Sequence, residues 1–166
     1  MKSVTTNILL SACAAFVAMT NPCLAQPKTM VIFSSGTPCI GSPATPPLFA
    51  ALSVSSKATS PTSAAVVTGP ISFEDVAVTR NVDDCSVSLY GLLFQQQRIK
   101  SVTISFYNSV NGSEKETLRI SLGNVLMTSI GDADNAGSAA QERVTLAFES
   151  ITILDPVTGK STTYLK

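Results

Sequence analysis

The chain has 166 residues, with eleven basic and eleven acidic side chains and no histidine or tryptophan. This length predicts one domain, and a formally neutral chain lacks the clustered cations that give affinity for nucleic acids or anionic lipid. Without histidine, the sequence excludes serine–histidine and cysteine–histidine catalysis, histidine-ligated zinc and the usual general base near neutral pH. We therefore expect no enzyme, no catalytic residue, no metal, no cofactor and no nucleic-acid partner.

The beginning of the chain predicts a secretory signal peptide over residues 1–25. Lys2 precedes a twelve-residue apolar run over 8–19, and small residues before Gln26 fit cleavage after Ala25. Twelve apolar residues are too few for the hydrocarbon core of a bilayer, which needs about 20. We expect no membrane span.

The same leader contains a second possible processing signal. Residues 10–13 resemble a bacterial lipobox, which would place a lipid on Cys13. That interpretation leaves residues 14–19 as an unexplained apolar start to the mature chain, so signal-peptide cleavage is favoured. The mature chain, residues 26–166, is then one domain exported to the periplasm or the extracellular space.

Cleavage after Ala25 leaves two cysteines, Cys39 and Cys85. In an oxidising compartment they form one potential disulfide, which in the chain-entropy model stabilises the fold by roughly 3–4 kcal/mol. The alternative is two buried, unreactive thiols. Two cysteines without histidine do not make a zinc site.

The first half of the mature chain is poor in charge and contains two apolar runs. Residues 30–33 and 48–54 have the composition of strands. Residues 55–65 carry serine, threonine, lysine and proline without periodicity, which predicts a long exposed loop.

The second half alternates more regularly between apolar and polar residues, which predicts antiparallel strands. The segments concerned are 71–80, 101–108, 118–127 and 144–153. The phase of the alternation switches at Gly123–Asn124 and again at Glu149–Ser150, as at a bulge or a sheet corner. Asn111–Gly112 is a strong hairpin signal between two of the strands.

One short helix is expected, beginning after a cap at Asp83 or Asp84 and ending near Gln96. Apolar residues recur at helical spacing from Cys85 to Leu93. A second helix face is expected to join the core: Val87, Tyr90 and Phe94. These elements predict a mainly β fold, an antiparallel β-barrel or sandwich of six to eight strands with one inserted helix.

Three short motifs favour structure over chemistry. Residues 132–137 resemble the start of a calcium loop, but Arg143 stands where a bidentate glutamate belongs. Residues 158–161 resemble the end of a phosphate loop, yet Leu154 replaces the required glycine. Glu74–Asp75 are neighbours on a predicted strand and should point to opposite faces, which argues against paired acid–base work.

As an ordered set, the elements resemble the Hcp family, the haemolysin-coregulated proteins of bacterial type VI secretion. Order and spacing agree from about Val31 to Leu154. The segments that carry the resemblance are Ile71–Arg80, Asp84–Gln96, Ser101–Tyr107, Ile120–Ser129 and Glu142–Ile151.

The resemblance implies a compact β-barrel with a lateral helix, assembled as a homo-hexameric ring. It also implies stacking of rings into a secretion tube, with effector proteins as possible cargo, and it matches residues 55–65 to a loop between stacked rings. The predicted signal peptide departs from this pattern. The alternative is therefore a monomeric periplasmic or extracellular binding module that kept the fold and lost the ring.

Overall fold

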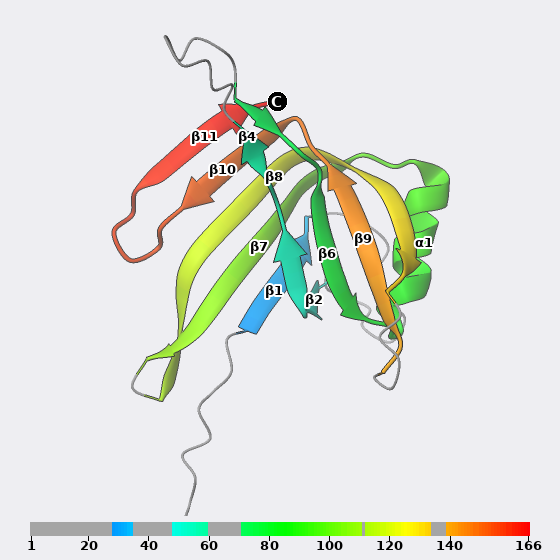
Figure 1. Ribbon diagram of the computed structural model, residues 1–166, viewed down its shortest axis with the longest axis horizontal. Helices are drawn as coiled ribbons and strands as arrows, with labels where there is room; N and C mark the ends of the chain where they lie inside the picture. The colour runs from blue at the N-terminus through cyan, green and yellow to red at the C-terminus, as the bar shows by residue number, and fades with distance from the viewer. Residues whose placement is uncertain (1–27, 35–47, 60–70, 111, 134–138) are drawn as a thin grey trace, which may run out of the picture.

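The structure, a computed structural model, describes residues 28–34, 48–59, 71–110, 112–133 and 139–166. These residues form eleven strands and one helix (Figure 1). Their bounds are β1 Lys28–Phe33, β2 Leu48–Ala51, β3 Ser53–Ser55, β4 Ala58–Thr59, β5 Ser72–Phe73, β6 Val76–Asn81, α1 Cys85–Gln95, β7 Ile99–Val110, β8 Ser113–Asp132, β9 Gln141–Ala147, β10 Ser150–Leu154 and β11 Ser161–Leu165. No helix in this part of the chain is long and apolar enough to cross a membrane.

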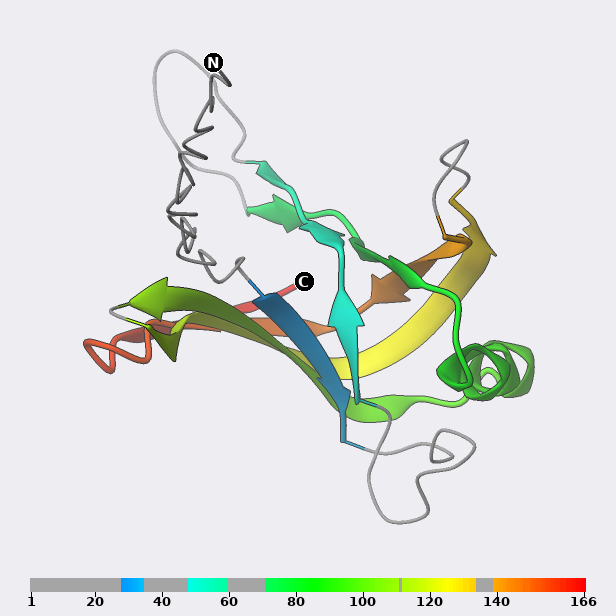
Figure 2. The same ribbon diagram turned by 90° about the horizontal axis from the view of Figure 1, so that it is seen from below.

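The strands follow one path, β2-β1-β7-β8-β9-β6-β3, in which every pairing is antiparallel. The two ends of this path are consecutive in sequence, because only Leu52 separates β2 from β3. The Leu52 N–H donates to the carbonyl of Thr79 in β6 at 2.8 Å, so the path returns on itself. Figure 2 shows β1 and β7 on one side of the molecule and β3 and β6 on the other. The predicted fold class is confirmed, with seven strands along the path.

Two short ribbons extend this framework. The β10–β11 hairpin is attached through β10 to the edge of β8, and β4 pairs with β5. The second ribbon corrects one prediction, because Ala58–Thr59 lies in the expected loop over residues 55–65 and forms a strand instead. Backbone pairing with β5 overrides the lack of periodicity in this segment.

The long strand β8 links the two sides of the fold. Its first part, up to Val125, pairs with β7, and its last part, from Leu126, pairs with β9. Between them Asn124 takes a left-handed conformation with φ of 51°. The phase switch predicted at Gly123–Asn124 is therefore the corner where β8 changes partner. The second predicted switch, at Glu149–Ser150, separates β9 from β10.

The core fills the space between the strands and is closed on one side by α1. On β7 the alternation places Val102 and Ile104 inside, as predicted, and on α1 Leu89 and Leu92 face the sheet. The hairpin predicted at Asn111–Gly112 is confirmed by the pairing of β7 with β8 on either side of it. Fully buried apolar side chains are Val31, Phe33, Val78, Leu89, Ile99, Val102, Ile104, Leu122, Val125, Val144 and Leu146.

The helix α1 ends where the sequence predicts, but its second face does not join the core. Gln96 takes the left-handed conformation that closes many helices, with φ of 48°. Phe94 is 79% exposed and Val87 is 64% exposed, which corrects the expectation that they are core residues. Leu89 and Leu92 face the strands, whereas Val87 and Phe94 lie on the outer face and no described strand covers them.

Candidate functional site

A buried ionic cluster joins β6, β9 and the start of α1. Arg80 and Glu142 are opposite each other in the β6–β9 pairing, and each is only 1% exposed. The Arg80 guanidinium donates from Nη1 to Glu142 Oε1 at 3.0 Å, and Ser86 donates its hydroxyl to the same oxygen at 2.9 Å. Arg80 also forms an ion pair with Asp83 through Nη2. The cluster thus ties the helix to two neighbouring strands.

The same cluster includes the helix cap. Asp83 Oδ1 accepts from the N–H of Cys85 at 2.7 Å, and the Asp83 N–H donates to the Ser86 hydroxyl at 3.1 Å. Asp84 makes no side-chain cap bond. Of the two predicted caps, Asp83 is therefore the one that satisfies the free backbone groups at the helix start.

The Arg80 guanidinium also contacts an aromatic ring. Its central carbon lies 4.4 Å from the ring centroid of Phe49 in β2. Within the described part of the chain its Nε atom has no hydrogen-bond acceptor. The ring face supplies part of the stabilisation that a further acceptor would give, because aromatic faces attract cations.

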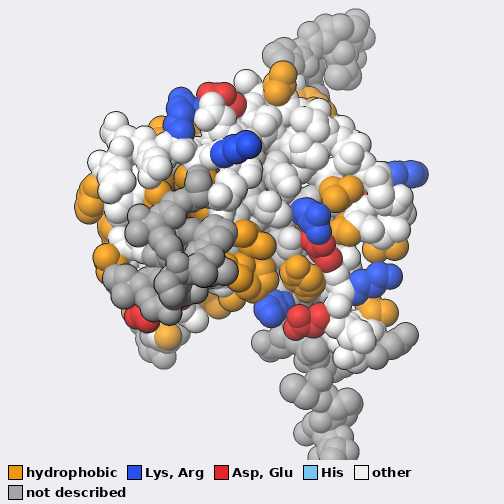
Figure 3. All heavy atoms as spheres, turned by 180° about the vertical axis from the view of Figure 1, so that it is seen from behind, with side chains coloured by type: hydrophobic (Ala, Val, Ile, Leu, Met, Phe, Trp, Pro, Cys, Tyr) orange, Lys and Arg blue, Asp and Glu red, His pale blue; other side chains and the backbone are white. Residues whose placement is uncertain are grey.

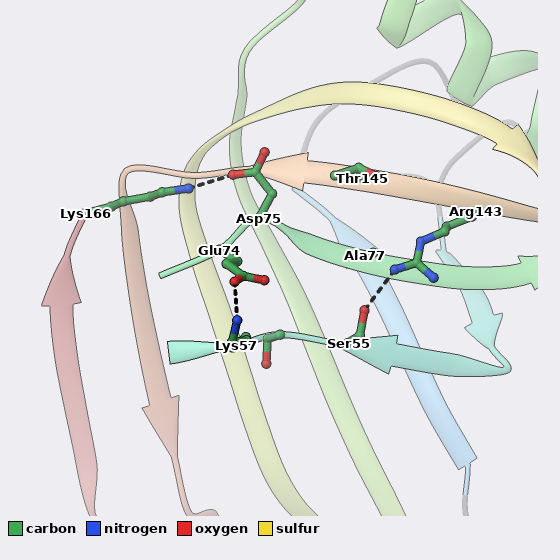
Figure 4. Close-up of a pocket in the computed structure, with 9 residues that line it drawn as sticks. Ser55, Lys57, Glu74, Asp75, Ala77, Arg143, Thr145 and Lys166 are labelled. Atoms are coloured by element: carbon green, nitrogen blue, oxygen red, sulfur yellow. Dashed lines mark hydrogen bonds and ion pairs between the residues drawn. The ribbon is translucent and has the colours of Figure 1, made fainter. Parts of the chain in front are cut away.

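On the outer surface of the sheet lies a polar cavity of about 580 Å³ (Figure 4). Its floor follows a row across three paired strands, Ser55 on β3, Ala77 on β6 and Thr145 on β9. Around this floor stand three cations and two acids. The residues that line the cavity are Ser55, Ser56, Lys57, Glu74, Asp75, Ala77, Arg143, Thr145 and Lys166.

Glu74 and Asp75 both line this cavity and turn toward different lysines (Figure 4), and the prediction that they lie on a strand is wrong. They lie between β5 and β6, where the backbone is not extended in a ladder, so the alternation of a strand does not apply. Lys57 bonds Glu74 at 2.7 Å, and Lys166 bonds Asp75 at 2.6 Å. Each acid is neutralised by a lysine, an arrangement that does not suit acid–base catalysis.

Arg143 stands at the other end of the cavity. It donates from Nη2 to the Ser55 hydroxyl at 3.3 Å, and it takes part in no ion pair within the described residues. An arginine presents five N–H donors in a planar fork, so a single long hydrogen bond leaves most of them available.

A second surface feature is the outer-helix patch, formed by Val87, Tyr90 and Phe94. The rings of Tyr90 and Phe94 are tilted against each other with centroids 6.0 Å apart. A further exposed apolar site, the hairpin patch, is Val157 in the β10–β11 turn, which is 58% exposed; Leu165, 80% exposed, lies at the other end of the hairpin. In Figures 1 and 2 the β10–β11 hairpin and α1 lie on opposite sides of the molecule. Figure 3 shows further hydrophobic side chains at several places on the face opposite to that of Figure 1, between isolated charged groups.

Hydrogen bonds lower the pKa values of two partly buried carboxylates. The hydrogen bond from Arg119 lowers the pKa of Glu116 on β8. The hydroxyl of Thr158, together with two backbone N–H groups, lowers the pKa of Asp155. Asp155 thereby organises the turn between β10 and β11, which contains Thr158, Gly159 and Lys160, while Ser161 begins β11.

Other predicted positions fall outside the described residues. These are the signal peptide with its cleavage between Ala25 and Gln26, Cys39, and most of the loop over 132–137. Cys85 is buried at the start of α1, and its disulfide with Cys39 stays a prediction. No cluster of potential metal ligands occurs among the residues that the structure describes.

Sequence reasoning missed the Arg80–Glu142 pair, although a signal was present. Arg80 continues the apolar phase of Val76 and Val78, and Glu142 begins the phase of Val144 and Leu146. Opposite charges in the buried phase of two strands indicate an internal ion pair if the strands are neighbours. The sequence did not say that β6 and β9 are neighbours.

The described residues define a class of fold. It is an antiparallel β fold whose strands lie on two sides of the core, with one lateral helix. The family model described as "Type VI secretion system effector, Hcp" matches residues 49–154, more than half of the chain. The chain therefore belongs to the Hcp family. No curated protein matches it in sequence.

Solved structures support the fold. A structure titled "Crystal structure of Hcp protein" has a TM-score of 0.69 at 15% identity, covering 84% of this chain and 98% of its own. A mutant Hcp1 from the E. coli EAEC 042 pathovar has a TM-score of 0.66 at 17% identity, covering 84% and 97%. The secreted protein Hcp3 from Pseudomonas aeruginosa has a TM-score of 0.61 at 14% identity, covering 84% and 96%.

Proposed function

We propose that this protein is a non-enzymatic structural protein that assembles into homo-hexameric rings after export from the cytoplasm. The observation that carries the proposal is the outer-helix patch, carried by α1 on the side of the protomer opposite the β10–β11 hairpin, whose turn holds the exposed Val157 of the hairpin patch. Contiguous exposed apolar patches mark surfaces for protein contact. Membership of the Hcp family supports a role in type VI secretion.

The placement of the two patches favours a ring over a two-fold dimer. A ring needs a head-to-tail interface, in which one patch of each protomer meets a different patch of the next and the rotation closes. A two-fold dimer would bring one patch against its own copy. In the proposed ring, Phe94 of one protomer packs near Val157 of its neighbour, and effector proteins are carried in the lumen.

Light scattering after size-exclusion chromatography, with negative-stain images of the same peak, tests the ring. We expect a mass of six protomers, and we expect Phe94→Ser and Val157→Ser each to release protomers. Val110→Ser is the matched control, because Val110 is exposed on the β7–β8 hairpin outside both patches. A monomeric wild-type protein at micromolar concentration would contradict the proposal.

The alternative function is a monomeric periplasmic or extracellular binding module. The observation that favours it is the polar cavity of about 580 Å³, a volume within the range of ligand sites. A clean monomer in the scattering experiment would leave this alternative as the better account.

Export and disulfide formation are part of the proposal and have their own test. We expect the N-terminus of the exported protein to be Gln26. We also expect Cys39 and Cys85 to be joined, so that alkylation without reductant labels neither. Mass spectrometry of the exported protein measures both. A blocked, lipid-modified Cys13 would favour the lipobox alternative.

A further inference from the structure

The polar cavity is the place where the fold brings the most charged side chains together at the surface. Its lining comes from four separate parts of the chain: β3 with the residues after it, the β5–β6 connection, β9, and Lys166. We propose that this cavity binds a carboxylate of a peptide, with Arg143 as its principal ligand. The proposal goes beyond ring assembly and does not depend on it.

The shape of the cavity follows from the strand register. Ser55, Ala77 and Thr145 are aligned across β3, β6 and β9, and Arg143 lies two residues before Thr145 on the same outer face of β9. Ala77 is the central residue of the row and has the smallest side chain that a strand residue other than glycine can have. A hollow therefore remains between the taller side chains on either side (Figure 4).

The charges in the cavity select the kind of ligand. Lys57, Arg143 and Lys166 against Glu74 and Asp75 leave one net positive charge on the lining side chains. One positive charge matches a single carboxylate, whereas a phosphate dianion would meet repulsion from two acids nearby.

Arg143 is the cation to which this net charge belongs. Lys57 and Lys166 each already bond a carboxylate of the lining, at 2.7 Å and 2.6 Å. Arg143 holds only the Ser55 hydroxyl, at 3.3 Å, so its fork can bind both oxygens of an incoming carboxylate.

The other residues that line the cavity can form hydrogen bonds with the backbone of a peptide. The hydroxyls of Ser55, Ser56 and Thr145 can donate to carbonyls or accept from backbone N–H groups. The oxygens of Glu74 and Asp75 can accept further N–H groups. The side chains of Lys57 and Glu74 are 63% and 59% exposed, so the mouth of the cavity is open to a ligand from solvent.

Amide NMR titration of the full chain, as the cell processes it, tests the proposal with four probes. These are a tetrapeptide with one glutamate and both ends blocked, its blocked glutamine twin, a glutamine tetrapeptide with a free C-terminus, and inorganic phosphate. We expect saturable shifts at Arg143 and Ser55 with the glutamate peptide, the free C-terminus, or both, which identifies the source of the carboxylate. The blocked glutamine twin should bind about tenfold more weakly or not at all, because it lacks the charge-assisted pair.

Three variants assign the binding to Arg143. Arg143→Gln should lower the affinity for the carboxylate peptide by about tenfold or more. Arg143→Lys should lower the affinity less, because the ammonium group keeps the charge but cannot form the bidentate pair. Lys115→Gln, on the β7–β8 hairpin away from the cavity, is the matched control and should change nothing. Since Arg143→Lys keeps the charge, it gives a readout even if Arg143→Gln disturbs the fold.

The following results would overturn the inference: binding of the blocked glutamine peptide as tight as that of both carboxylate peptides, tighter binding of phosphate than of both carboxylate peptides, no saturable shift with any probe, or unchanged affinity in both Arg143 variants. None of these outcomes alters the mass of the assembly. The failure of this inference and the failure of the ring are therefore distinguishable.

Discussion

Two ionic clusters of this protein lie on opposite faces of the same strands. The inner cluster is formed around Arg80 and Glu142, which are almost completely buried, and the outer cluster lines the polar cavity around Lys57 and Glu74. Both contain a lysine or arginine bonded to a carboxylate at 2.7–3.0 Å. They differ in their access to water.

This difference in solvation separates a structural role from a binding role. Charges without water have to be paired, and removing one partner leaves the other charge buried and uncompensated. Exposed pairs exchange readily with water and contribute little to stability. The inner cluster therefore holds α1 to the sheet, while the outer cluster is free to exchange its partners for a ligand.

The largest loss of stability is expected when the ion pair of the inner cluster is broken. Arg80→Met should lower the free energy of unfolding by about 3–5 kcal/mol, because Glu142 remains buried without its partner. Urea denaturation measures this change. Arg98→Met, which breaks the exposed Arg98–Glu149 pair, is the control and should cost at most about 1 kcal/mol. The double variant Arg80→Met with Glu142→Leu should recover most of the loss, and no recovery would contradict the assigned role.

The buried and exposed faces of α1 allow the same comparison with apolar side chains instead of charged ones. Leu89 is fully buried, so Leu89→Ala should lower the free energy of unfolding by about 2–5 kcal/mol. Phe94→Ala removes a larger side chain but should change the stability of the protomer by less than about 0.5 kcal/mol, because Phe94 packs against little. Thermal unfolding of dilute protein measures both. Equal losses would mean that Phe94 is buried within the protomer.

Breaking an ion pair of the outer cluster should lower the stability of the protein only slightly. Lys57→Ala should cost about 0.2–1 kcal/mol of unfolding free energy, because its partner Glu74 is exposed to water. The loss should shrink further in high salt, which screens exposed pairs. Denaturation at two salt concentrations measures it, with Lys115→Ala as control. A loss as large as that of Arg80→Met would show that the outer cluster is structural.

The smallest expected effect concerns pH. The lowered pKa of Asp155 means that its contribution to stability is present above the pKa of the unfolded chain and is lost as the pH falls through the folded-state pKa. Thr158→Val removes the largest cause, so the folded-state pKa should rise toward the ordinary 3.8 and the stability lost on acidification should become smaller. Carboxyl NMR titration measures this directly. An unchanged pKa in Thr158→Val would contradict the assignment to the hydroxyl.

Local patterns predicted the elements well, because each depends on neighbouring residues. Alternation placed Val102 and Ile104 inside β7, and the phase switch at Gly123–Asn124 gave the corner of β8. The same reasoning failed at Glu74–Asp75, because the pair lies between strands, and at Phe94, because helical periodicity gives a face but not what covers it.

The strand phases, the helix with its limits, the hairpin at Asn111–Gly112 and the likeness to the Hcp family can all be read from the order of the residues. Which strands are neighbours cannot, and it is visible only in the folded chain. Arg80 and Glu142 are 62 positions apart, and Lys57 and Glu74 are 17 apart. The periodicity of one strand fixes the face on which a side chain lies, whereas its partner is fixed by the register of another strand far away in the chain. Both ionic clusters depend on that second condition, and so does the proposed peptide site.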